Sequence, residues 1–134
     1  MPQRTLELRT HDPDAQLRFC EIERFEDGSG YACVLEVESR GFSGRSSFYF
    51  EEPGLRSFLD GLSRLDNLEV AEAMLKGQWD SDFVRFSSDA RGRCMVQGQL
   101  SEQSDLGQEL RFAFCTDQTV LQHLANGLRQ WLAA

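Results

Sequence analysis

Two stretches of the sequence, FYFEEPGLRSFLDGLSRL at residues 48–65 and FAFCTDQTVLQHLANGLRQWL at residues 112–132, share one plan. Each opens with a Phe-x-Phe pair, typical of a strand that buries one face, and continues with apolar residues at helical spacing. The Phe-x-Phe pairs lie 64 residues apart, and the Gly-Leu pairs inside the helices, Gly61-Leu62 and Gly127-Leu128, lie 66 apart. This match predicts two copies of one strand-and-helix unit.

Alternating apolar and polar residues upstream of the first helix predict four strands. The alternation within residues 16–26 changes parity at Cys20 and Ile22, which indicates a β-bulge. The turn-forming residues 27–30 join this run to the next, so we expect a hairpin there. The tetrapeptide Gly41-Phe42-Ser43-Gly44 then precedes the fourth run.

The second half repeats the pattern with alternating runs that begin at Phe83, Cys94 and Leu110. Residues 68–76 are ambiguous, because their composition favours a helix whereas the repeat favours a strand with Ala71, Ala73 and Leu75 on one face. We expect a strand. The predicted fold class is therefore α+β, with about eight mostly antiparallel strands and two helices in two pseudo-repeated ββββα units, 1–66 and 67–134, within a single domain 1–134.

Charge narrows the choice of partners. The 134 residues include 22 acidic and 14 basic side chains, for a formal net charge of −8, and neither half of the chain is basic. Proteins that bind nucleic acids usually carry a basic patch, so we expect no direct contact with nucleic acid. An acidic field favours a basic protein partner, although such a charge also serves solubility.

The chain carries little that catalysis requires. The four cysteines, Cys20, Cys33, Cys94 and Cys115, lack zinc-ligand spacing, so we expect neither a metal nor another cofactor. No nucleophile elbow, phosphate loop or dinucleotide motif is present, which favours a protein that is not an enzyme. The N-terminus lacks a secretory signal and no apolar run approaches the ~20 residues of a membrane span, so we expect a cytoplasmic protein with no membrane partner.

Paired carboxylates are the candidate binding residues. Glu36 and Glu38 lie two apart on a predicted strand and therefore share a face, while Glu51 and Glu52 end the fourth run. Such pairs can form a solvated sheet face, a docking surface for a basic protein, or the acid and base of a glycosidase. We take Glu36, Glu38, Glu51 and Glu52 as candidate partner-binding residues.

Two segments resemble a known family. Gly41-Phe42-Ser43-Gly44 leading into Phe48-Tyr49-Phe50, and Asp117-Gln118-Thr119-Val120-Leu121 after Phe112-Ala113-Phe114, resemble the signature stretches of WapI-type immunity proteins, over about residues 34–132. The resemblance implies a small bacterial protein, encoded beside a contact-dependent toxin, that inhibits the toxin by binding it.

A toxin that cleaves RNA tends to be basic near its active site, so the implied partner is a basic protein, namely the cognate toxin. An alternative is a cytoplasmic scaffold without a toxin partner, or a homodimer paired through an exposed strand edge.

Overall fold

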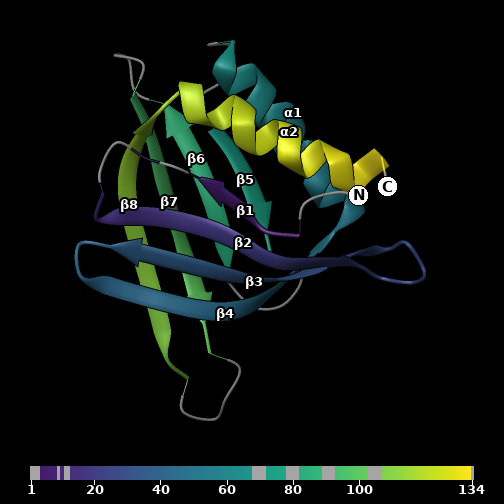
Figure 1. The fold of residues 1–134 in the computed structure, drawn as a ribbon, viewed down its shortest axis with the longest axis horizontal. Helices are drawn as coiled ribbons and strands as arrows, with labels where there is room; N and C mark the ends of the chain where they lie inside the picture. The colour runs from purple at the N-terminus through teal and green to yellow at the C-terminus, as the bar shows by residue number, and fades with distance from the viewer. Residues whose placement is uncertain are drawn as a thin grey trace.

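The structure is a computed structural model of the chain, and it describes residues 4–8, 10, 13–67, 72–77, 82–88, 93–102 and 107–133. The first half forms β1 (Leu6–Leu8), β2 (Ala15–Arg24), β3 (Gly30–Ser39), β4 (Phe42–Glu51) and α1 (Glu52–Asp66). The second half forms β5 (Glu72–Lys76), β6 (Phe83–Ser88), β7 (Arg93–Ser101), β8 (Glu109–Asp117) and α2 (Thr119–Ala133). Each half is an antiparallel four-stranded sheet in sequence order followed by a helix, which confirms the predicted ββββα repeat (Figure 1).

The irregularities of the first sheet lie close to where the sequence placed them. In β2 the register shifts between Cys20, which is opposite Val34, and Glu23, which is opposite Ala32, and Glu21 has a φ of 52°. This is the predicted bulge. The next connection is tighter than the sequence suggested, because Arg40 and Gly41, with φ of 50° and 87°, form a two-residue turn and Phe42 already belongs to β4.

The described part of the ambiguous segment, residues 72–76, is strand β5, as the repeat predicted. Ala73 and Leu75 are buried and pair with Phe86 and Val84 of β6. Helical propensity is overridden here because an extended segment buries two apolar side chains and completes a ladder with β6. Ala71 and the rest of 68–71 lie outside the described residues.

Each helix packs against a strand of the other half of the chain. Helix α1 packs on β5, and Gly61 allows this approach, since a Cβ there would stand 2.7 Å from the Cβ of Ala73. Helix α2 packs on β1, where a Cβ on Gly127 would stand 2.6 Å from Leu6 Cδ2. Figure 1 shows the two helices side by side across one end of both sheets. Each half thus covers the first strand of the other.

The strands of the two sheets cross, as Figure 1 shows, with their apolar faces toward each other. A continuous core contains buried residues from both sheets and both helices. Two hydrogen bonds join the sheets at their margin, from Ser39 Oγ to the Ala113 carbonyl (3.2 Å) and from Ser46 Oγ to the Ser101 carbonyl (2.8 Å). Ser39 thereby covers part of the free edge of β8. No helix among the described residues has the length and apolarity to cross a membrane.

Candidate partner-binding surface

The outward faces of the two sheets differ in charge. Alternation in β1 to β4 turns their apolar residues inward and leaves six glutamates but only two arginines, Arg18 and Arg45, on the outer side of the first sheet. We call this surface the acidic face; its glutamates are Glu7, Glu21, Glu23, Glu36, Glu38 and Glu51. On the second sheet, the outward residues of the described strands include four cations and three carboxylates. Among the outward strand residues that the structure describes, the excess of negative charge therefore lies on the first sheet.

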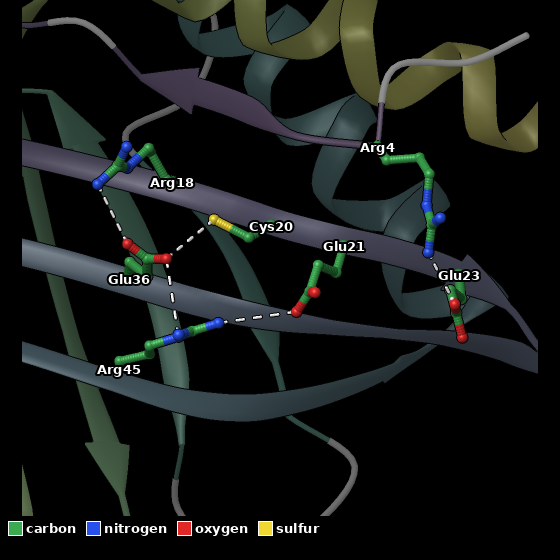
Figure 2. Close-up of polar contacts among 7 residues, drawn as sticks. All are labelled: Arg4, Arg18, Cys20, Glu21, Glu23, Glu36 and Arg45. Carbon is green, nitrogen blue, oxygen red and sulfur yellow. Dashed lines mark hydrogen bonds and ion pairs between the residues drawn. The ribbon is translucent and has the colours of Figure 1, made fainter.

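Glu36 lies at the centre of an ordered network on this face (Figure 2). Arg18 Nη2 approaches its Oε2 at 3.1 Å from β2, and Arg45 Nε approaches its Oε1 at 3.7 Å from β4. Arg45 Nη2 also lies 3.7 Å from Glu21 Oε2, on the bulge of β2. Two arginines thus balance the charges of two glutamates, and Glu36 is held in one orientation.

The Cys20 thiol also belongs to this network, and it is not activated as a nucleophile. Its Sγ donates a hydrogen bond of 3.3 Å to Glu36 Oε1 (Figure 2). Burial, with the Glu36 hydrogen bond and charge as smaller causes, raises the pKa of the Cys20 thiol. Burial likewise raises the pKa of Cys94 to about 11. A nucleophilic cysteine requires a lowered pKa, so neither thiol is prepared for that role.

The structure separates the four predicted glutamates. Glu36 and Glu38 lie toward the turn end of β3, opposite Arg45 and Ser43. Glu51 is opposite Gly30 at the other end of the same ladder, roughly 20 Å from Glu36 at the rise of an extended strand. Glu52 belongs to α1 rather than to the sheet face. Its Oε1 lies 3.4 Å from Arg56 Nη2 and 4.0 Å from Arg24 Nη2.

Glu38 differs from Glu36 in its surroundings. Its side chain is exposed, and among the described residues no cation lies within ion-pair distance of it. Glu38, Glu36, Arg18 and Arg45 are among the residues that line a shallow hollow of about 310 Å³. Among the described residues, the unbalanced charge at this end of the acidic face is therefore that of Glu38.

Phe42, at the same end of the hairpin as Glu38 but on the other face of the sheet, is a residue whose exposure the sequence pattern did not reveal. It begins β4 opposite Ser39, and 70% of its surface is exposed, whereas most phenylalanines of the chain are buried. Exposed large aromatic side chains often serve as anchors of protein interfaces, and Phe42 is exposed directly after a tight turn. In the sequence, only the turn residues Arg40 and Gly41 could have indicated that Phe42 is exposed.

Catalytic and metal-binding groups are sparse in the part of the chain that the structure describes. Within it, no group of three or more His, Cys, Asp or Glu side chains is placed to hold a metal ion. His123 is exposed on α2, which agrees with its place off the apolar stripe, whereas His11 lies outside the described residues.

Comparison with known proteins agrees with this architecture. No curated protein matches the chain. A solved structure described as "Crystal structures of trypanosoma bruciei MRP1/MRP2" matches with a TM-score of 0.57 and 11% identity, over 98% of this chain and 84% of that one. At this identity the likeness shows the fold alone. The model of the "Immunity protein WapI-like family" matches residues 3–134, a longer span than the two motifs suggested. The chain therefore belongs to the WapI-like family of immunity proteins.

Proposed function

We propose that this chain neutralises a bacterial toxin by binding it, without catalysis, through the acidic face of the first sheet. The observation that carries the proposal is the charge contrast between the two sheets, with six glutamates against two arginines among the outward strand residues of the first. One further arginine, Arg4, reaches Glu23 from outside the strands. Family membership supplies the class of partner, since immunity proteins act on toxins. A partner with a cationic surface fits the acidic face by charge complementarity.

A toxin that cleaves RNA suits this surface best. Such an enzyme must hold phosphates with lysines and arginines, and carboxylates can occupy the same groups. The net charge of −8 would also attract a basic partner over a distance and raise the association rate at low salt. A complex formed in this way should weaken as the salt concentration rises.

Residues of the acidic face would contribute in different ways. Glu36 is pre-oriented by Arg18 and Arg45, so it serves chiefly to keep the surface in shape. Glu38 is exposed and has no cation partner among the described residues, so its charge would meet a cation of the toxin. Phe42, exposed at the same end of the hairpin but on its other face, would fill an apolar recess of the partner.

The test uses the protein encoded beside this chain as the toxin. Co-expression should rescue the growth of cells that produce the toxin, and purified components should form a stable complex. The variant E38K should lower the association rate constant about tenfold or more, because it reverses an exposed charge that no described cation balances. The matched control is E72K, the same exchange at an exposed strand residue of the second sheet. It should leave the rate within about twofold.

Two results would contradict the proposal. One is wild-type affinity in a folded variant in which Glu36, Glu38, Glu51 and Glu52 are all replaced by lysine. The other is rescue without any complex, which would indicate that the chain acts on the toxin or its substrate chemically. Circular dichroism on each variant confirms that it is folded.

A further inference from the structure

The outer side of the second sheet carries a positive island. Strand pairing places Phe83, Gln99 and Arg111 in one row across β6, β7 and β8. The next row holds Arg85, Gln97 and Ala113. These two rows contain two arginines and no carboxylate, in a chain whose net charge is −8.

The two arginines of this island are held by neutral amides. Arg85 Nη2 donates to Gln97 Oε1 at 2.6 Å, and Arg111 Nε donates to Gln99 Oε1 at 3.2 Å. Among the described residues, no carboxylate lies within ion-pair distance of either arginine. The arginines of the first sheet, by contrast, face glutamates (Figure 2). An amide fixes a guanidinium without neutralising it, so both arginines keep their full charge and most of their five N–H donors.

The surface between them is hollowed. A depression of about 300 Å³ is lined by residues that include Phe83, Arg85, Arg111 and Ala113. The side chain of Ala113 is only a methyl group, and because its neighbours are long, the surface is lower at this position. Gln99, which holds Arg111, is itself only 5% exposed, so one side of the site is anchored in the sheet. The arginines are therefore pre-organised around an open recess.

We propose that this recess binds a carboxylate-bearing segment of a protein partner. Aspartate or glutamate side chains accept two parallel hydrogen bonds from a guanidinium, and two oriented guanidiniums lie at one hollow. The site is separate from the acidic face, and it goes beyond the toxin-binding function proposed above. An acidic segment could dock here whether or not a basic surface occupies the first sheet.

A single-stranded nucleic acid fits this recess less well than a peptide does. Nucleic acids need free aromatic faces on which bases can stack, but the guanidinium of Arg85 already covers the ring of Phe83, with Cζ 5.9 Å from the ring centroid. A polyanion with one charge per nucleotide would also be repelled by the net charge of −8. A segment with a few carboxylates meets less repulsion and uses the same donors.

The experiment is a titration of the ¹⁵N-labelled protein with an acetylated, amidated tetraglutamate peptide, observed by NMR. The Nε–Hε signals of Arg85 and Arg111 should shift together and saturate. R85Q and R111Q should each weaken the affinity about tenfold or more, because each removes charge-assisted donors. The matched control is R129Q, at an exposed arginine of α2 that also bonds an amide, Asn126 Oδ1 at 2.9 Å. It should change the affinity less than twofold.

Three results would overturn the proposal. They are shifts that do not saturate, equal loss of affinity in R129Q, and tighter binding of oligouridylate than of tetraglutamate at the same ionic strength. The toxin-binding proposal is tested independently, because it fails if E38K leaves the association rate with the toxin unchanged. A loss of tetraglutamate binding in R85Q with intact toxin affinity would support the recess as a second site. The ¹⁵N spectra also report whether each variant remains folded.

Discussion

At the scale of single residues, the phenylalanines show what alternation can and cannot predict. Phe48, Phe50, Phe112 and Phe114 are buried, as their Phe-x-Phe spacing predicted. The same parity places Phe42 on the inward side of β4, yet it is exposed. Nearby inward residues of this hairpin, Ser39 and Gly44, contact β8, the last strand of the second sheet, and Phe42 lies at the turn end of the hairpin. Its exposure depends on where the opposing sheet ends, which no local pattern contains.

The substitution of phenylalanine by alanine should affect the free energy of unfolding very differently at Phe58 and at Phe42. Phe58 is fully buried in α1 and meets the ring of Phe86 edge-on, with centroids 5.7 Å apart. F58A should lower the free energy of unfolding by about 3–5 kcal/mol, because it removes buried apolar surface and leaves a cavity. F42A should change that free energy by less than about 0.5 kcal/mol. Urea titration measures both, and a loss below 1 kcal/mol for F58A would contradict the core position of this residue.

At the scale of elements, the helices and strands followed from periodicity, whereas their contacts did not. The stripe of α1, including Leu55, Phe58 and Leu62, is buried as predicted. Helix α1 begins at Glu52, with Glu51 as N-cap and no side-chain hydrogen bond from the cap. At the start of α2, Asp117 Oδ1 accepts a hydrogen bond from the N–H of Thr119 at 3.0 Å. That each helix packs on the other half was not predictable from one unit's pattern.

The glycines of α1 test this exchanged packing. In a helix, Gly→Ala normally stabilises by about 0.4–1 kcal/mol through the unfolded chain. G54A should do so, because nothing lies within 4 Å of the added Cβ. G61A should instead destabilise by about 1–2 kcal/mol, since its Cβ would stand 2.7 Å from Ala73 Cβ and 3.0 Å from Ala73 Cα, so strand β5 must move. Thermal unfolding compares the two, and a stabilising G61A would contradict close packing of α1 on β5.

At the scale of the whole molecule, the sequence predicted the architecture and the sign of the charge, but not how the charge is distributed. Glu36 and Glu38 share a face because the strand period is two, which alternation predicts. The arginine partners of Glu36 come from β2 and β4, and the amide-held arginines come from β6 and β8, so both arrangements depend on strand register. Register across strands is set by turns and a bulge, and a single sequence indicates it only loosely.

Because each helix packs on the other half of the chain, we predict that residues 1–134 unfold as one unit. Without its other half, fragment 1–66 would expose the stripe of α1 and leave β1 uncovered, and fragment 67–134 would expose α2 and β5 in the same way. We expect neither fragment alone to give a dispersed NMR spectrum, whereas the full chain should lose far-UV circular dichroism and near-UV signal at one urea concentration. Two separate transitions, or a fragment that folds unaided, would show instead that the repeats are independent units held together only by their sheet faces.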